Sequence, residues 1–282
     1  ESPVFEQGFV GFMLVDPEKN KTIYSHNAGK YFTPASNTKL FTFYAGLKIL
    51  GDSIPALKYA IENDTLYFKA TGDPSFLNEN SPNSAVFQFL KKSENPLAYV
   101  APTYTEKHQG PGWAWDDYNA YYSAERTAFP IYGNMVGFKF KKNKEFPLVS
   151  PSIFKDSLIS SKDSLVSARL RRNIVKNSFQ FNNQEKESDF TQSVPFKYSS
   201  EILLRLLSDT LQKSVSLVQN SEINKKLDKT RYSIPSDSVY KEMLKVSDNF
   251  IAEQILIMAA GKLSDTLKSD IAIKYMKENH LK

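Results

Sequence analysis

Two regions with helical patterns enclose a long middle stretch of short β-like segments, and this arrangement limits the folds open to the chain. Near the start, apolar residues recur at the helical spacing i, i+3, i+4, i+7: Leu40, Phe43, Tyr44 and Leu47. Helical patterns return at 199–213 and 249–263. Between about 57 and 225, β-like runs such as "TLYFKA" and "VGFKFKK" alternate with clusters of Pro, Asn, Ser and Gly. We therefore predict an α/β protein with a mainly β insert.

The N-terminal region predicts a hairpin followed by a helix. The segments "GFVGFMLVD" (8–16) and "KTIYSH" (21–26) are typical of strands, and "PEKN" between them is typical of a turn. A loop then leads to a helix that begins at about Ser36 and meets a C-terminal cap position at Gly51. This order places Ser36 at the N-terminus of a helix that emerges beside a sheet.

Composition excludes several classes of protein and of site. With 41% hydrophobic and 24% charged residues, the chain is expected to fold, and it has no apolar run of transmembrane length. The absence of cysteine removes disulfides, thiolate nucleophiles and Cys-based metal sites. The three histidines (His26, His108 and His280) are scattered singly, which argues against a His-based metal site. We expect neither a cofactor nor a metal.

The excess of basic over acidic residues permits an anionic partner but does not predict nucleic-acid binding. The net charge is +5 and the isoelectric point is about 9.0. Only "KFKKNKEF" (139–146) and "RLRRN" (169–173) form dense basic patches, and solvated surface is the favoured interpretation of each. We therefore expect no nucleic acid among the partners.

The segment "TPASNTKLFT" (33–42) contains a candidate nucleophile and base. Residues i and i+3 share a helix face, so the Lys39 amine can reach the Ser36 hydroxyl. A serine needs a neighbouring base to become a nucleophile, and a lysine can be that base when its environment lowers its pKa. The first turn of a helix also favours negative charge that develops at the serine.

The Ser-x-x-Lys spacing is weak on its own. It occurs twice more in this chain, at Ser152…Lys155 and Ser238…Lys241, and an ordinary helix start remains an alternative explanation for Ser36. Only the first copy follows a Pro-Ala loop end and opens a long amphipathic helix.

The triplet Ser247-Asp248-Asn249 is a second candidate element. In an extended segment the first and third side chains point the same way, so Ser247 could relay a proton and Asn249 could bind a peptide carbonyl. The Ser-x-Asn pattern also starts at Ser25, Ser81 and Ser93. A plain N-cap for the helix that follows is an alternative interpretation, and it is compatible with a catalytic loop.

Together these blocks resemble a known family. Ser-x-x-Lys followed by Ser-Asp-Asn belongs to the motif set shared by penicillin-binding proteins and serine β-lactamases. The blocks "PASNTKLFT", "TGDPSF", "GPGWAWDDYNAYYSAE" and "SDNFIAEQIL" are similar, in this order, to low-molecular-mass class C penicillin-binding proteins. These are the D-alanyl-D-alanine carboxypeptidases/endopeptidases of peptidase family S13.

The resemblance implies roles for four residues. Ser36 would attack the D-Ala-D-Ala bond of a peptidoglycan peptide and form an acyl-enzyme, with Lys39 as the base. Ser247 would relay the proton, and Asn249 would bind substrate and Lys39. The implied partners are peptidoglycan peptides ending in D-Ala-D-Ala and β-lactam antibiotics. The implied location is the periplasm or cell envelope of a bacterium, after removal of a signal peptide.

The resemblance also implies a domain arrangement. The expected fold is the penicillin-recognising serine transferase fold, an antiparallel sheet flanked by helices. Residues 1–56 and 226–282 would form this domain, interrupted by a mostly β insert at 57–225. The family's third element, Lys-Thr-Gly on a strand, does not occur in the sequence. We therefore expect the chain to be an N-terminal part of a longer protein, with the C-terminal part of the main domain missing.

Two other functions compete with this prediction. A His-dependent hydrolase lacks support because no Gly-x-Ser-x-Gly elbow accompanies the histidines. A non-catalytic cell-wall-binding protein with the same fold is the stronger alternative, since the third motif is absent. Labelling of the full-length protein by a fluorescent penicillin would distinguish it from an enzyme, because we expect this chain alone to be weakly active or inactive.

Overall fold

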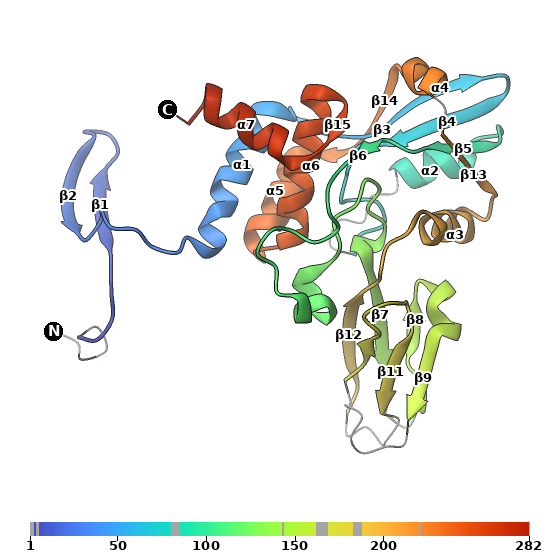
Figure 1. Ribbon diagram of the computed structural model, residues 1–282, viewed down its shortest axis with the longest axis horizontal. Helices are drawn as coiled ribbons and strands as arrows, with labels where there is room; N and C mark the ends of the chain where they lie inside the picture. Colours follow the sequence, from blue (N-terminus) through green and yellow to red (C-terminus); the bar gives the residue numbers. More distant parts are fainter. Residues whose placement is uncertain are drawn as a thin grey trace. The chain divides into compact units, whose positions relative to one another are not determined.

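The computed structural model describes residue 3 and the ranges 6–79, 85–142, 144–161, 169–182, 188–219 and 221–281 (Figure 1). Residues 1–38 and 39–282 form two compact units.

The N-terminal unit contains the predicted hairpin. Strand β1 (Phe12–Asp16) pairs antiparallel with β2 (Lys21–His26). Asp16 stabilises the connecting turn, because its Oδ1 accepts hydrogen bonds from the backbone N–H groups of Glu18 and Lys19 at 3.0 and 3.2 Å. The predicted hairpin is therefore confirmed. Further along the chain, a short 3-10 turn covers Ala35–Asn37.

A mixed five-stranded sheet organises the larger unit. Its strand order is β13-β5-β4-β3-β14. Strands β3, β4 and β14 pair antiparallel, whereas β4, β5 and β13 run parallel. The strands are β3 (Ser53–Glu62), β4 (Thr65–Ala70), β5 (Leu97–Val100), β13 (Val215–Val218) and β14 (Lys229–Pro235). All four residues of β5 are buried, as expected for a central strand of apolar sequence.

A separate group of strands forms a lobe next to this sheet. An antiparallel sheet has the order β12-β7-β8, and a second small sheet has the order β10-β11-β9. Their bounds are β7 (Met135–Phe140), β8 (Leu148–Ser150), β9 (Leu158–Ser161), β10 (Arg171–Arg172), β11 (Phe179–Asn182) and β12 (Phe190–Pro195). The shortest pair, β6 (Thr103–Tyr104) with β15 (Thr266–Leu267), lies outside the lobe.

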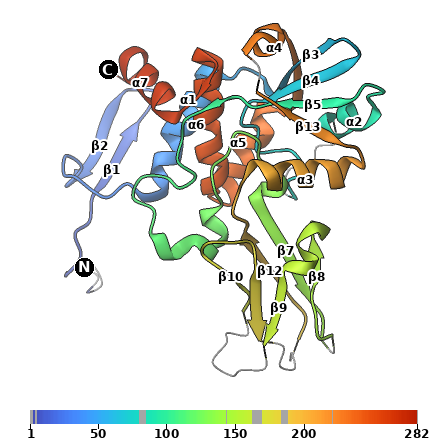
Figure 2. The same ribbon diagram turned by 45° about the vertical axis from the view of Figure 1, so that its right-hand side comes forward.

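One hydrophobic cluster joins the lobe to the five-stranded sheet. It contains Phe68 of β4, Phe138 of β7 and Phe179 of β11. Helix α3 (Ser200–Leu211) contributes four buried leucines to the same cluster, and Figure 2 shows this helix between the sheet and the lobe. The Ser199 side chain caps α3 by accepting a hydrogen bond from the Ile202 N–H at 3.1 Å, in agreement with the helix predicted over 199–213.

Four described α-helices were not predicted from the sequence. Helix α2 (Ala85–Lys92) packs Val86 and Leu90 into the same cluster, and the short α4 (Ser221–Lys226) follows β13. Helices α5 (Ser236–Lys245) and α7 (Ser269–Asn279) lie in the C-terminal part.

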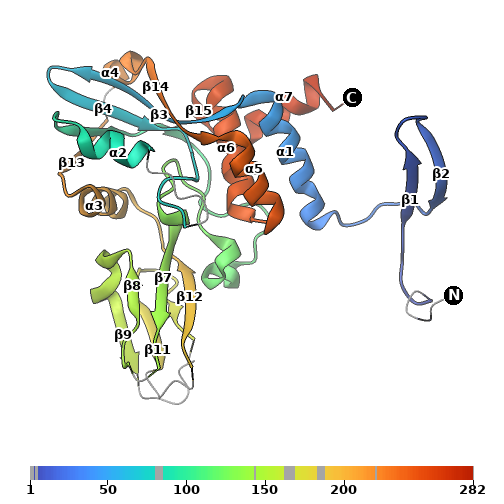
Figure 3. The same cartoon turned by 180° about the vertical axis from the view of Figure 1, so that it is seen from behind.

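A second hydrophobic cluster is helical. It unites α1 (Thr38–Ile49), α5, α6 (Asn249–Ser264) and α7, and Figure 3 shows α1, α5 and α6 side by side. The approach of α1 to α5 requires glycine at position 46, because a Cβ there would lie 2.7 Å from a ring carbon of Tyr240. This helical layer presents one end of α1 and one end of α6 to the candidate site.

Helix α6 matches its prediction at the start and extends beyond it at the end. Asp248 is the N-cap, and its Oδ1 accepts a hydrogen bond from the Ile251 N–H at 2.9 Å. The helix predicted over 249–263 ends one residue later, at Ser264, and Asp265 takes the left-handed cap conformation with φ of 58°. An Asp tolerates this conformation, so a glycine is not required there.

The α/β fold class is confirmed, and the predicted domain division stays a prediction. Strand β3 crosses residue 56, and β14, from the predicted main domain, pairs with it. Residues on both sides of the predicted boundary therefore share one sheet. In the part of the chain that the structure describes, no helix combines the length and apolar character that a membrane crossing requires.

Candidate active site

The structure brings two of the predicted site residues into direct contact. Lys39 lies near the start of α1 and is only 6% exposed. Its Nζ donates a hydrogen bond to Oδ1 of Asn249 over 2.6 Å, although the two residues are 210 positions apart. The first and second motifs therefore meet across the α1–α6 layer.

The environment of Lys39 disfavours its charged form. Burial lowers the pKa of the Lys39 amine from its ordinary value of 10.5, and the carboxylates of Asp248 and Glu253 oppose this shift. Its hydrogen-bond partner, the Asn249 amide, carries no charge. A lysine with a lowered pKa can accept a proton at a lower pH than an ordinary lysine.

Helix α6 holds Asn249 and Ser247 at its N-terminal end. Asn249 is the first helical residue, and the cap formed by Asp248 fixes the turn before it. Ser247 is exposed and has φ of 56°, a left-handed conformation that is uncommon for serine. Local strain of this kind occurs where neighbouring structure dictates the backbone, and Ser247 lies in the short connection between α5 and α6.

Ser36 lies in the 3-10 turn Ala35–Asn37 and is exposed. Pro34 and Ala35 precede it, and Ala35 has φ of 45°, so the backbone changes direction immediately before the serine. Ser36 belongs to the N-terminal unit and Lys39 to the larger one. Their approach to within hydrogen-bond reach stays a prediction.

The other two copies of the Ser-x-x-Lys spacing lie in unrelated places. Ser152 begins a 3-10 helix in the lobe, and its hydroxyl donates to Oδ2 of Asp209 on α3 at 3.3 Å. Ser238 is exposed on α5.

A buried glutamine connects α6 with the Gly-Asp-Pro block. Gln254 is fully buried, and its Nε2 donates to the carbonyl oxygens of Gly72 and Thr127 at 2.8 and 2.9 Å. Its Oε1 accepts from the Thr127 N–H at 3.2 Å. Gly72 has φ of 94°, and a Cβ there would lie 3.2 Å from Ile257, so glycine is needed for both conformation and space.

A buried arginine that directly follows the block "GPGWAWDDYNAYYSAE" connects this part of the chain with α6. The Arg126 guanidinium is 3% exposed and forms ion pairs with Glu253 at 3.0 Å and with Glu106 at 3.1 Å. It also donates to the carbonyl oxygens of Lys107 and Gln109. Glu253 is one of the carboxylates that raise the pKa of Lys39. By pairing with Glu253, Arg126 adds a positive charge that offsets this carboxylate.

Sequence reasoning missed Arg126, Glu253, Gln254 and Glu106. A signal existed for two of them, because Glu253 and Gln254 interrupt the otherwise apolar run "NFIAEQILIMAA" within the second motif block. Polar side chains on a buried helix need partners, and these two bind the other blocks.

A cavity of about 460 Å³ opens beside the start of α6. Asp248 and Phe250 contribute to its wall, the segment before β7 contributes Tyr121 and Tyr132, and the lobe contributes Arg169 and Gln192. The cavity is large enough for part of a peptide ligand. Among the described residues, no group of His, Cys, Asp and Glu side chains is arranged to hold a metal ion.

A family model matches almost the whole chain. The matched family is described as the D-Ala-D-Ala carboxypeptidase 3 (S13) family, and the match covers residues 1–279. The chain belongs to this S13 family. The family resemblance expected from the four sequence blocks is thereby confirmed.

Individual relatives agree with S13 membership. A D-alanyl-D-alanine carboxypeptidase from Actinomadura sp. (strain R39) is 32% identical over 91 residues, a stretch that covers 28% of this chain and 16% of the relative. The S13 chain is thus aligned with only a small part of that relative's length.

Solved structures show the same fold. Penicillin binding protein 4 from Haemophilus influenzae matches 96% of this chain and 68% of its own, with a TM-score of 0.68 and 19% identity. A second structure of that protein, complexed with a novel β-lactam, matches with a TM-score of 0.61 and 18% identity over 96% of this chain and 66% of that one. The predicted penicillin-recognising fold is therefore confirmed.

Proposed function

We propose that this S13 protein is a serine-type D-Ala-D-Ala carboxypeptidase/endopeptidase that acts on peptidoglycan peptides through an acyl-enzyme on Ser36. One observation carries the proposal: Lys39 of the first motif is buried and hydrogen-bonded to Asn249 of the second motif. Such a lysine can serve as a general base for a neighbouring serine.

In the proposed reaction Lys39 accepts the Ser36 proton as the hydroxyl oxygen attacks the penultimate D-Ala carbonyl. The tetrahedral intermediate collapses, the C–N bond breaks, and the leaving amine receives a proton from Lys39 by way of Ser247. Water then attacks the ester, Lys39 takes the water's proton directly or by way of Ser247, and this proton passes to the Ser36 oxygen as the ester C–O bond breaks. The shortened peptide leaves and the Ser36 hydroxyl is restored.

Asn249 has two roles in this proposal. Its Oδ1 holds the Lys39 amine, and its Nδ2 remains available to donate to a peptide carbonyl. The Ser36 N–H would give one hydrogen bond to the oxyanion. A strand with a Lys-Thr-Gly element would give the second, and this element does not occur in the sequence.

The proposed substrate is supported by the cavity beside Asp248, where a peptide stem that leads to the scissile bond would lie. β-Lactams are proposed as inhibitors, because the H. influenzae protein of the same fold has been solved with one. A substrate of this kind places the protein in the periplasm or cell envelope of a bacterium.

The test is covalent labelling by a fluorescent penicillin. Ser36→Ala should abolish labelling, because it removes the attacking oxygen. Lys39→Ala should slow acylation by about 10²-fold or more, the usual scale for loss of a general base. Labelling reactions stopped at successive times and read by gel fluorescence measure both the extent of labelling and the acylation rate.

The chance copies of the spacing provide matched controls. Ser152→Ala and Ser238→Ala remove the same atom from the lobe and from α5, and both should label at the wild-type rate. If the full-length wild-type protein does not label, the non-catalytic cell-wall-binding alternative replaces this proposal.

A further inference from the structure

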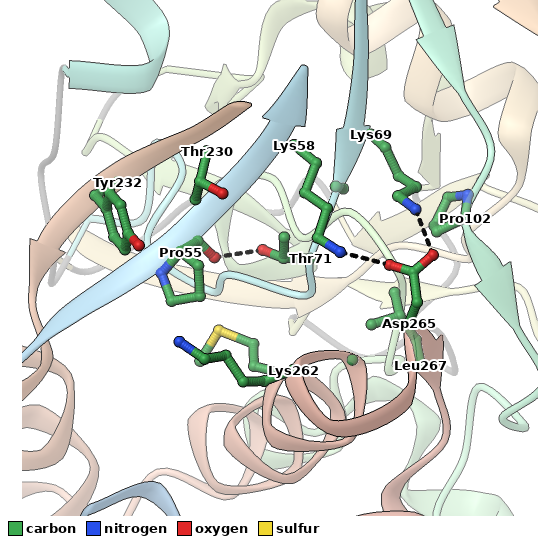
Figure 4. Close-up of a pocket in the computed structure, with 13 residues that line it drawn as sticks. Pro55, Lys58, Lys69, Thr71, Pro102, Thr230, Tyr232, Lys262, Asp265 and Leu267 are labelled. Carbon is green, nitrogen blue, oxygen red and sulfur yellow. Dashed lines mark hydrogen bonds and ion pairs between the residues drawn. The ribbon is translucent and has the colours of Figure 1, made fainter. Parts of the chain in front are cut away.

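A second cavity lies at the opposite end of α6 from the candidate active site. Its volume is about 220 Å³, and it is enclosed between β3, β4 and β14 on one side and the last turns of α6 on the other (Figure 4). Met258, Gly261, Lys262 and Asp265 follow helical spacing and form the α6 wall. Asn249 and Asp265 are the two ends of this helix, on the order of 24 Å apart.

Three lysines and one carboxylate line this cavity. Lys58 and Lys69 both bind Asp265, with Nζ–O distances of 2.7 and 2.8 Å. Lys262 lies on the other side of the cavity, below Pro55 in Figure 4. Among the described residues, no acidic side chain pairs with Lys262. The lining thus carries three positive charges against one negative charge.

The Lys69 ammonium is the most unusual member of this group. Its side chain is 4% exposed, and among the described residues Asp265 is its hydrogen-bond partner. An ammonium has three N–H donors, so one bond to Asp265 leaves two donors without a protein acceptor in a buried position. Buried donors of this kind cost free energy until a ligand or water accepts from them.

Asp265 does not neutralise the group. Burial alone would raise the pKa of the Asp265 carboxyl, but hydrogen bonds from Lys58 and Lys69 lower it below 3.8, so the carboxylate is ionised at neutral pH. The C-terminus of α6 adds roughly half a negative charge. The balance of the cavity remains positive.

Much of the remaining wall is apolar. Pro55, Pro102, Met258 and Leu267 contribute hydrocarbon surface, and Thr230 and Tyr232 add hydroxyl-bearing side chains. The single hydroxyl hydrogen of Thr71 is shared between the carbonyl oxygens of Pro55 and Ala56. A site with cations on two sides of a largely apolar wall favours an anion that carries a small apolar body.

We propose that this cavity is a binding site for a small organic carboxylate with a compact apolar body. The carboxylate would accept hydrogen bonds from Lys69 and Lys262, and the apolar body would contact Met258 and Leu267. This site does not depend on the proposed reaction at Ser36, because it lies at the other end of α6.

The test is an NMR titration of the full chain with isobutyrate, at low ionic strength so that screening does not hide the effect of the lysines. Isobutyramide has the same shape without the charge and is the matched ligand control. Backbone amide signals of Thr71, Gly261 and Asp265 should shift with isobutyrate, saturating in the millimolar range, and should not shift with isobutyramide.

Two variants locate the binding. Lys262→Met removes an exposed charge from the cavity and should weaken binding about tenfold or more, the scale of one charged hydrogen bond. Lys277→Met makes the same change on exposed α7, outside the cavity, and should leave the affinity unchanged. Thr230→Trp should fill the cavity from β14 and remove binding without a change in charge.

Several results would overturn the proposal. Equal shifts with isobutyrate and isobutyramide would show that the lysines do not select an anion. Equal losses in Lys262→Met and Lys277→Met would place the binding elsewhere. Saturable shifts with inorganic phosphate but none with isobutyrate would reject an organic carboxylate as the ligand. The absence of shifts with any of these ligands would reject the site.

Discussion

The amine of Lys39 is buried against an uncharged partner. If a carboxylate stood in place of the Asn249 amide, its charge would favour the ammonium form and oppose the effect of burial. The amide satisfies one N–H of Lys39 without adding charge, so burial decides the direction of the pKa shift. Asp248 and Glu253 limit this shift from a greater distance.

Asn249→Asp tests this balance with an isosteric side chain. The new carboxylate should raise the pKa of Lys39, so a higher pH is needed to obtain the neutral amine. The acid limb of the pH–acylation profile should therefore move to higher pH, as measured by penicillin labelling from pH 5 to 10. An acidic residue in the first turn of α6 favours the helix, so the fold should persist.

Glu253→Gln should have the opposite effect. It removes one of the carboxylates that raise the pKa of Lys39, while Glu106 still pairs with Arg126. The acid limb should move to lower pH. If both variants move the profile in the same direction, or if neither does, Lys39 is not the group that titrates in acylation.

The sequence predicted the Lys39–Asn249 pair but not the side chains behind it. The pair follows from the resemblance of the two motif blocks to the S13 family. Arg126 has no such local signal, and its partner on α6, Glu253, lies 127 positions away. Gln254 interrupts an apolar run, but its partners Gly72 and Thr127 lie 182 and 127 positions away. Their roles depend on which segments pack against α6, and a single sequence does not encode that in any local pattern.

At the scale of elements, α6 joins most of the structure that surrounds the candidate site. Its first residue holds Lys39, and Gln254 binds the backbone of two loops that contain Gly72 and Thr127. The position of Asn249 therefore depends on hydrogen bonds made one and a half turns further along the helix.

Gln254→Leu should destabilise the protein by at least about 2 kcal/mol, because it leaves buried backbone groups of Gly72 and Thr127 without partners. Urea unfolding followed by circular dichroism measures the change. Gln88→Leu makes the same substitution on the exposed surface of α2 and should change stability by less than about 0.5 kcal/mol. A similar effect of both variants would contradict the role given to Gln254.

Elements with strong local patterns were predicted, and elements that depend on packing were not. The hairpin has a turn signal, and α3 and α6 have clear caps. Helix α1 is present as predicted, but its buried face is not the predicted apolar one, since Leu40 and Leu47 are exposed. Helices α5 and α7 are more polar, and a few residues anchor each of them, such as Met243 and Met276, in a core formed with α1 and α6. Their helical state depends on that core, which sequence periodicity alone does not reveal.

At the scale of the larger unit, two large hydrophobic clusters account for most of the described core. One cluster runs from the five-stranded sheet through α3 into the lobe, and the other unites α1, α5, α6 and α7. Because the lobe shares its cluster with the sheet, we expect these two parts to lose structure together.

Phe138→Ala should show this coupling. The substitution removes a buried ring from the lobe and should cost about 3–5 kcal/mol. Amide hydrogen exchange should accelerate in β7 and also in α3 and β4, which contribute to the same cluster. Exchange confined to the lobe would show that the lobe unfolds independently.

Met243→Ala is the matched variant in the helical cluster. It should cost about 2–5 kcal/mol and accelerate exchange in α1, α5 and α6 more than in the lobe. Comparing the hydrogen-exchange rates of the two variants tests whether the two clusters lose structure independently.

The close contact between α1 and α5 has a practical consequence for protein engineering. Replacing glycine by alanine is a common way to stabilise a protein, typically by about 0.4–1 kcal/mol where the backbone and space permit it. Gly46 does not permit it, because a methyl group would overlap the Tyr240 ring, and Gly72 fails on both conformation and space. Gly137 in β7 is the better choice, since its nearest neighbours would lie at an ordinary 3.7 Å from the added methyl. A thermostability screen should therefore enrich alanine at 137 and reject it at 46 and 72.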